Sequence, residues 1–165
     1  MERYRLVTTW KLEAAREEIW ELLTGRPERN EWKGVTIRRL AGEGPAAIGT
    51  RYESVFRTRL GYKLAFLSTI VRMERPALLE IRASGHLEGT GSCSLTQEGD
   101  ATVLRYEWEV CTKKRWMNAL APLLRPAFLW NHEQVMQEGA AALSRRLGVR
   151  LVSLAPGLTA GRPNG

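Results

Sequence analysis

The feature that most constrains the fold of this chain is a long helical pattern close to its C-terminus. Residues 113–148 have helical spacing, and from Phe128 onward, at about 100° per residue, one broad apolar stripe is formed by Leu129, Val135, Met136, Gly139, Ala142, Leu143 and Leu147. His132 lies near the middle of this stripe, and Arg145 falls on the opposite, polar side. A helix with so wide an apolar face must pack against a large partner.

The start of this helix is expected to be less regular than its middle. Pro122 and Pro126 each lack a backbone N–H, and a proline inside a helix costs about 3 kcal/mol. We therefore predict a break or bend, with a short segment over residues 116–121 and the main helix from about residue 123 to Gly148, a glycine suited to ending it.

The partner of the helix is predicted to be a β-sheet, because the chain before residue 112 consists mainly of strand patterns. Residues 3–12 alternate between apolar and polar side chains, and residues 101–112 do so most clearly. Turn residues divide the rest into strands at 35–41, 50–60, 62–74, 78–84 and 88–98. Residues 62–74 alternate too poorly to predict which set faces inward.

Two short helices are expected between the first strand and the others. Residues 14–24 have helical spacing, and Pro27 is suited to the first turn of a second short helix, in which Trp32 supplies an apolar anchor. The predicted fold class is α+β, with a curved antiparallel sheet of about seven strands wrapped around the long C-terminal helix. Residues 1–150 are predicted to form one domain, and residues 151–165, rich in glycine and proline, a flexible tail.

Charge and hydropathy narrow the range of partners. The net charge of +7 comes from 25 basic and 18 acidic residues that are interspersed along the chain, which favours solvated surfaces with paired charges over a nucleic-acid interface. No apolar run approaches the ~18 residues of a membrane span, and the N-terminus lacks the pattern of a signal peptide. A cytoplasmic location is therefore expected, with peripheral membrane contact left open.

The two cysteines are predicted to be free thiols. If residues 88–98 and 101–112 form a hairpin about Gly99-Asp100, Cys93 lies opposite roughly residue 106, and Cys111 is on the order of 16 Å further along the strand. Free thiols agree with a reducing compartment.

The order of these elements resembles the helix-grip domains of the START-like superfamily, which includes polyketide cyclase/dehydrases, lipid-transfer domains and the birch-pollen-allergen group. The local matches are residues 15–23 (AREEIWELL) followed by Pro27 and Trp32, the segments Gly42-Glu43-Gly44 and Gly49-Thr50-Arg51, and residues 85–91 (GHLEGTG). The resemblance implies a pocket between the sheet and the long helix, with its opening near residues 42–49 and 85–91. Members often have a large aromatic residue where this chain has Cys93, which implies a roomier pocket here.

Candidate ligand-binding residues are those that the patterns direct toward the space between sheet and helix. They are Trp10, Tyr52, Phe56, Tyr106 and Trp108 from the strands, with Phe128, His132 and Met136 from the helix. Filling of an ordinary core explains these aromatic residues nearly as well. His132 and Tyr106 are also the candidate catalytic residues, because a histidine can exchange protons with an enolisable ketone; a hydrogen-bonded core histidine is the simpler interpretation. No ligand spacing for a metal is present, and no cofactor is expected.

Three functions follow from this pattern. The first is the binding and carriage or sensing of a hydrophobic small molecule such as a lipid, a polyketide or an isoprenoid. The second is an aromatase/cyclase-like enzyme that acts on a polyketide through His132 or a pocket tyrosine. The third is a module that binds a protein or a membrane surface, because Trp130 falls on the outward face of the long helix, about 160° from His132.

Overall fold

The computed structural model describes residues 3–29, 32–58 and 61–158. Its centre is one antiparallel sheet with the strand order β2-β3-β4-β5-β6-β7-β1-β8. The strands are β1 (Arg3–Leu12), β2 (Val35–Arg39), β3 (Arg51–Arg57), β4 (Lys63–Glu74), β5 (Leu78–Gly85), β6 (Leu87–Glu98), β7 (Ala101–Thr112) and β8 (Leu151–Leu158). The helices are α1 (Arg16–Thr24), the 3₁₀-helix η1 (Pro27–Arg29), α2 (Arg115–Ala119) and α3 (Ala121–Leu147).

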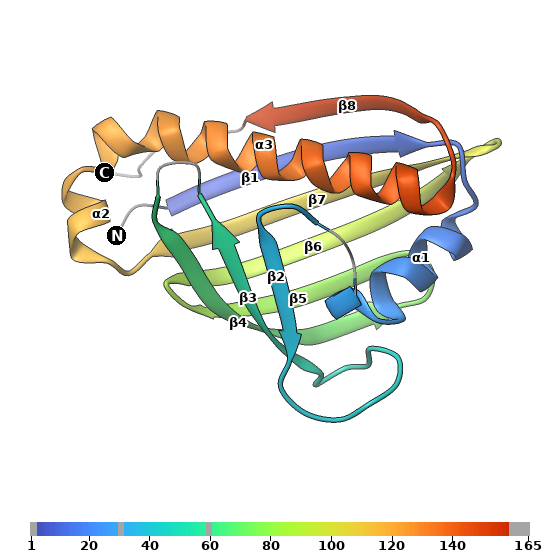
Figure 1. Cartoon of the computed structure of the whole chain (residues 1–165), viewed down its shortest axis with the longest axis horizontal. Helices are drawn as coiled ribbons and strands as arrows, with labels where there is room; N and C mark the ends of the chain where they lie inside the picture. Colours follow the sequence, from blue (N-terminus) through green and yellow to red (C-terminus); the bar gives the residue numbers. More distant parts are fainter. Residues whose placement is uncertain (1–2, 30–31, 59–60, 159–165) are drawn as a thin grey trace.

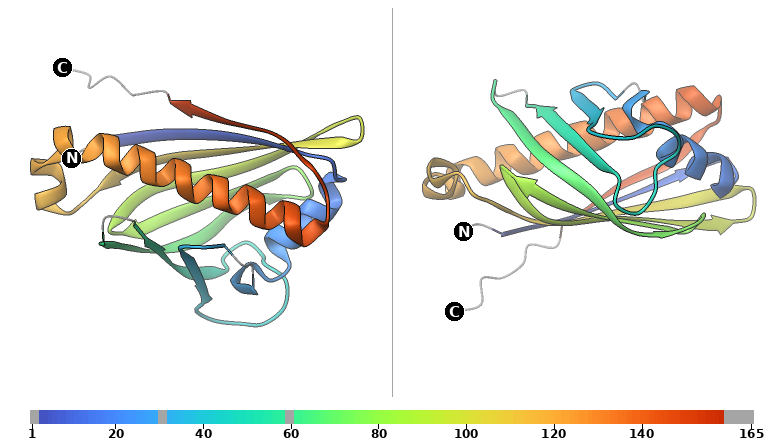
Figure 2. Two further views of the ribbon diagram at one scale, coloured as in Figure 1. Left: turned by 45° about the horizontal axis from the view of Figure 1, so that its top comes forward. Right: turned by 90° about the horizontal axis from the view of Figure 1, so that it is seen from below.

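The sheet curves around α3, which crosses its concave face (Figure 1). Figure 2 shows the same arrangement from two further sides, with the sheet bending away below the helix. The predicted α+β class with a curved antiparallel sheet around a long C-terminal helix is therefore confirmed, and the sheet has eight strands where the patterns predicted about seven.

Alternation along β7 explains how the sheet divides its two faces. Leu104 and Val110 are buried on the concave face, whereas Arg105 and Glu107 lie on the convex face and pair with each other at 3.3 Å. The hairpin of β6 and β7 places Cys93 opposite Tyr106, as predicted, and both cysteines are free.

The structure also shows the orientation of β4, which the alternation had left open. Its inward set consists of four buried residues, Leu64, Phe66, Ser68 and Ile70. The pattern was indistinct because the outward set includes Ala65, Leu67 and Val71, and because an inward position is occupied by a serine.

The long helix begins two residues earlier than predicted. The break falls at Leu120, between α2 and α3, so that Pro122 lies in the first turn, where its missing N–H is harmless. Pro126 lies inside the helix. Gly148 ends α3 with φ of 65°, a left-handed conformation that glycine adopts without strain, and this glycine reverses the chain.

The expectation of a flexible tail over residues 151–165 was wrong for residues 151–158. These residues form β8, which pairs antiparallel with β1, for example Trp10 with Leu154 and Thr8 with Pro156. β1 would otherwise expose a row of unpaired backbone groups at the edge of the sheet, and Pro156 is tolerated because β8 is itself an edge strand. Residues 159–165 lie outside the described part of the chain.

Two separate groups of buried residues hold the sheet and helices together. One lies toward α1 and contains Trp10, Leu12, Ile19, Trp20, Leu95, Leu104, Met136, Ala140 and Leu143. The other contains Tyr4, Leu6, Leu64, Phe66, Ala83, Leu87, Val110 and Phe128. The side chains of these two groups leave unfilled space between α3 and the concave face, and this space is the candidate site.

Candidate functional site

A cavity of about 840 Å³ lies between α3 and the concave face of the sheet. Its floor is formed by β1 and by β3 to β7, its roof by α3, and its remaining side by η1 and β2. Apolar side chains predominate in its walls, and no acidic residue of the described chain lines it. A volume of this size falls within the range of small-molecule binding sites.

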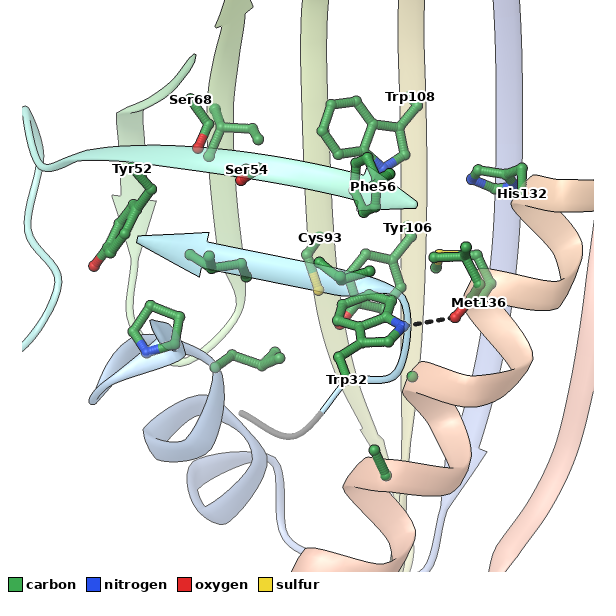
Figure 3. A pocket seen from close by; sticks show the side chains of 18 of the residues that line it. Trp32, Tyr52, Ser54, Phe56, Ser68, Cys93, Tyr106, Trp108, His132 and Met136 are labelled. Atoms are coloured by element: carbon green, nitrogen blue, oxygen red, sulfur yellow. Dashed lines mark hydrogen bonds between the residues drawn. The ribbon is translucent and has the colours of Figure 1, made fainter. Parts of the chain in front are cut away.

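All eight residues predicted to bind a ligand line this one cavity. They are Trp10, Tyr52, Phe56, Tyr106 and Trp108 from the strands, and Phe128, His132 and Met136 from α3. Figure 3 shows Trp108, Phe56 and His132 toward one end of the cavity, Tyr106 and Cys93 in its middle, and Tyr52 at the far side. The structure thus brings the eight side chains together, and their contact with a ligand stays a prediction.

Four polar atoms in this wall are buried without a nitrogen or oxygen atom as hydrogen-bond partner among the described residues. They are Trp10 Nε1, Tyr52 Oη, Tyr106 Oη and His132 Nε2. Buried polar atoms in folded proteins almost always have a partner, because leaving one unpaired costs roughly 1–3 kcal/mol. Four such atoms in one cavity are therefore unusual.

Burial also sets the charge of these groups. It lowers the pKa of His132 to about 4 and raises the pKa of Tyr106 well above its usual value. Burial likewise raises the pKa of Cys93 to about 12, although the neighbouring Tyr106 hydroxyl lowers it in part. At neutral pH the side chains of His132, Tyr106 and Cys93 are consequently uncharged, so the interior of the cavity has a few polar groups and no charge.

Trp32 closes one side of the cavity, a role that its interpretation as a helix anchor had missed. Its Nε1 donates a hydrogen bond to the backbone oxygen of Val135 at 2.6 Å (Figure 3). The indole can lie this close to α3 because Gly139 has no side chain: a Cβ there would stand 2.5 Å from Trp32 Cζ2 and 2.9 Å from Trp10 Cη2. A glycine in the middle of an apolar helical stripe is the sequence signal that could have indicated this contact.

The segments near which the resemblance implied an opening, residues 42–49 and 85–91, contribute little to the lining of the cavity. Of residues 42–49, only Ala46 lines the cavity, and residues 85–91 contribute nothing to it because they form the ends of β5 and β6 and the turn between them. The solvent-exposed lining residues are Arg29, Arg145 and Arg146. Arg145 belongs to the polar side of α3 in the helical pattern, and it reaches the cavity because the cavity extends to the end of the helix.

A second feature of the surface lies at the opposite end of α3. Leu123 is 78% exposed and Trp130 is 44% exposed, and Trp116 and Leu120 are exposed beside them in sequence. The exposure of Trp130 on the outward face was predicted. No helix in the described chain is long and apolar enough to cross a membrane.

Comparison with known proteins identifies the fold. No protein-family model and no curated protein matches the sequence. Among solved structures, protein Ms6760 from Mycobacterium smegmatis has a TM-score of 0.63 at 13% identity, with 88% of this chain and 91% of that chain covered. A major latex-like protein from Panax ginseng has a TM-score of 0.61 at 12% identity, with 86% and 97% covered. The chain has the helix-grip fold that was expected from the order of its elements.

One further solved structure is also similar in fold, but its sequence identity is too low to indicate a shared function. CalU16 from Micromonospora echinospora has a TM-score of 0.52 at 18% identity, with 87% of this chain and 78% of that chain covered. At such identities, the function of this helix-grip chain has to be argued from its own site.

Proposed function

We propose that this protein binds an apolar small molecule in the cavity between α3 and the sheet, and that it carries or senses this molecule. The observation that carries the proposal is the combination of about 840 Å³ of apolar-walled space with four unpartnered polar atoms. A ligand that fills the space removes apolar surface from water, which stabilises the complex by about 25 cal/mol per Å².

The unpartnered atoms narrow the chemistry of this ligand. Trp10 Nε1 can only donate a hydrogen bond, so its partner in the ligand must be an acceptor such as a carbonyl, ether or hydroxyl oxygen. Tyr106 Oη can donate or accept, and the neutral imidazole of His132 can do either, depending on its tautomer. Because these groups are uncharged at neutral pH, the buried part of the ligand is expected to be uncharged too. An oxygen-bearing lipid, polyketide or isoprenoid fits this description.

The experiment is native mass spectrometry of the protein purified from its own cells, combined with titration of an apolar fluorescent dye. Wild type is expected to retain an adduct and to bind the dye. Cys93→Phe places an aromatic ring in the cavity and should weaken both, because it removes part of the space, whereas Cys93→Ser, which preserves the volume, should weaken neither. Wild-type protein that shows neither an adduct nor dye binding would contradict the proposal.

A polyketide aromatase/cyclase is the second candidate, favoured by the presence of His132 and Tyr106 in one cavity. The pKa of about 4 makes His132 a weak general base at neutral pH, which is why binding is preferred over catalysis. If His132→Ala and Tyr106→Phe abolish turnover of a polyketone while dye binding persists, the enzyme is the better description. Unchanged turnover in both variants would exclude these two residues from catalysis.

A membrane-surface role is favoured by a separate observation. Residues 113–132 contain four basic residues and no acidic one, and the exposed apolar residues Trp116, Leu120, Leu123 and Trp130 lie in the same segment. Interfacial tryptophan and leucine beside basic residues are typical of binding to anionic bilayers. Leu123→Ser with Trp130→Ser should prevent co-sedimentation with phosphatidylserine vesicles, and Val152→Ser, exposed elsewhere, should not. Equal binding of all variants would exclude this surface.

A further inference from the structure

The polar residues at the cavity mouth differ in charge from those inside it. Among the described residues that line the cavity, the exposed ones are Arg29, Arg145 and Arg146, and each carries a full positive charge. Arg146 Nη1 donates a hydrogen bond to the backbone oxygen of Arg29 at 2.9 Å, and Arg145 precedes Arg146 in α3 and lines the same cavity. The apolar cavity therefore ends in a cationic mouth where η1 meets the C-terminal turn of α3.

These three arginines have no carboxylate partner in the described part of the chain. Several arginines elsewhere on the surface are paired with carboxylates, as in Arg5–Glu107, Arg38–Glu53, Arg72–Glu80, Arg75–Glu21, Arg105–Glu107 and Arg150–Glu13. Glu28 is the acidic residue next to Arg29 in sequence, and it neither lines the cavity nor forms an ion pair with the three arginines. The mouth thus offers three guanidinium groups, without a carboxylate partner in the described chain, to an anion.

We infer that the ligand is an amphiphile with an anionic head group, a carboxylate or a phosphate, which Arg29, Arg145 and Arg146 hold at the mouth while the apolar body fills the cavity. The inference rests on the proposed binding of an apolar molecule and specifies its head group. Guanidinium groups donate charge-assisted, often bidentate hydrogen bonds to carboxylate and phosphate oxygens. From His132 to Arg145 the helix rises on the order of 20 Å, so the body of the ligand is long-chain.

The orientation follows from the distribution of charge. A head group with full charge would lose its hydration without compensation beside the neutral groups of Tyr106 and His132, whereas at the mouth it stays partly hydrated and meets three cations. An uncharged oxygen on the chain is left for Trp10 and Tyr106. The head therefore lies at the arginines and the tail points toward Phe128 and Trp108.

The test compares ligands that share one chain and differ only in the head: palmitate, hexadecyl phosphate and hexadecanol. Isothermal titration is expected to give at least about tenfold tighter binding for the two anions than for hexadecanol, and this preference should decrease at high salt. Arg145→Gln with Arg146→Gln should remove the preference by weakening the binding of the two anions far more than that of hexadecanol. The matched control is Arg150→Gln, an exposed arginine that pairs with Glu13 and does not line the cavity; it should change neither affinity.

Each outcome separates this inference from the function on which it rests. Binding of all three ligands with equal affinity, unaffected by the arginine variants, would overturn the anionic head group and preserve the apolar cavity as a binding site. Failure of all three, together with failure of the apolar dye, would instead contradict binding itself. Arg145→Lys keeps the positive charge and is expected to retain most of the preference for anions. If the lysine variant retains the preference and the glutamine variant loses it, the loss is due to the charge and not to a substitution at this position as such.

Discussion

The two faces of the sheet treat their polar groups in opposite ways, and consecutive residues of β7 show the contrast. Glu107 points to the convex face, where Arg5 and Arg105 pair with its carboxylate at 2.6 and 3.3 Å. Tyr106 points to the concave face, where its buried hydroxyl has no nitrogen or oxygen partner among the described residues. On the convex face these polar groups are paired within the chain, whereas on the concave face a buried polar group is left for a partner from outside the chain.

This difference teaches that the concave face is arranged for something other than maximal stability of the empty protein. A chain selected only for stability would fill the space with larger side chains, or would pair the polar atoms with one another. Cys93 and Ser68 are small residues that preserve the space instead, and Gly139 brings Trp32 in to close it. The following substitutions measure this difference between the two faces, and the largest expected effect is given first.

The largest effect is expected from His132. Its pKa of about 4 in the folded protein lies below the unperturbed value of 6.5, so the unfolded chain binds a proton between these values and the folded one does not. As pH falls from 6.5 toward 4, the free energy of unfolding should decrease by on the order of 3 kcal/mol through this residue. Above pH 6.5 its contribution is absent.

His132→Leu removes this group and should remove that pH dependence. Urea denaturation of wild type and variant at several pH values measures the difference in unfolding free energy between them. Because all other titrating groups are common to both proteins, the difference isolates His132. Parallel stability curves between pH 6.5 and 4 would show that His132 is not held neutral by burial.

Gly139→Ala tests the closure of the cavity by Trp32. Alanine normally stabilises a helix by about 1 kcal/mol relative to glycine, but here the added methyl group would collide with the indole of Trp32. We expect a loss of about 2 kcal/mol from overpacking. In a Trp32→Ala background the same substitution should be neutral or stabilising, and chemical denaturation of the four proteins gives the coupling. Stabilisation by alanine in both backgrounds would refute the contact.

Tyr106→Phe removes a buried hydroxyl and keeps the ring. The empty protein should be unchanged or more stable by up to about 1 kcal/mol, because the hydroxyl has no nitrogen or oxygen partner and its hydrogen bond with the thiol of Cys93 is weak. Affinity for an oxygen-bearing apolar ligand should fall at the same time. Calorimetric unfolding with a parallel binding titration measures both effects; lower stability of the empty variant would indicate a strong hydrogen bond within the protein.

Glu107→Gln provides the convex-face counterpart. It removes a carboxylate that is paired with exposed arginines, and such pairs contribute little because water and salt screen them. The expected loss of stability is smaller than any of the effects above, and it should disappear at high salt. A large, salt-independent loss would show that the convex face is as sensitive to its polar groups as the concave face.

Much of the concave face could be predicted from periodicity alone. Alternation directed Trp10, Tyr106 and Trp108 inward, and the helical stripe did the same for His132 and Met136, because both patterns depend only on the repeat of the backbone. The same reasoning placed Cys93 opposite Tyr106. It could not show whether these side chains fill a core or line a space, since that depends on the distance between sheet and helix.

Residues that act through distant contacts were not predictable in this way. Trp32 gave only the signal of an apolar anchor, and its position depends on Gly139, more than a hundred residues further along the chain. Arg29 and Arg146 meet across a similar separation at the mouth. Strand β8 was not predicted, because the C-terminal sequence around it is rich in glycine and proline. Its extended conformation depends instead on pairing with the edge of β1.

The sequence alone was sufficient for most of the secondary structure, for the inward and outward faces of the elements other than β4 and β8, and hence for the α+β architecture. These follow from local backbone geometry and from the removal of apolar side chains from water, which act wherever the pattern occurs. Only the tertiary structure decided the cavity, its closure by Trp32, its cationic mouth and the pairing of β8 with β1. Each of these depends on how segments far apart in the sequence pack together, because that packing sets the unfilled volume and the unpaired charges. A local sequence pattern contains no information about such distant contacts.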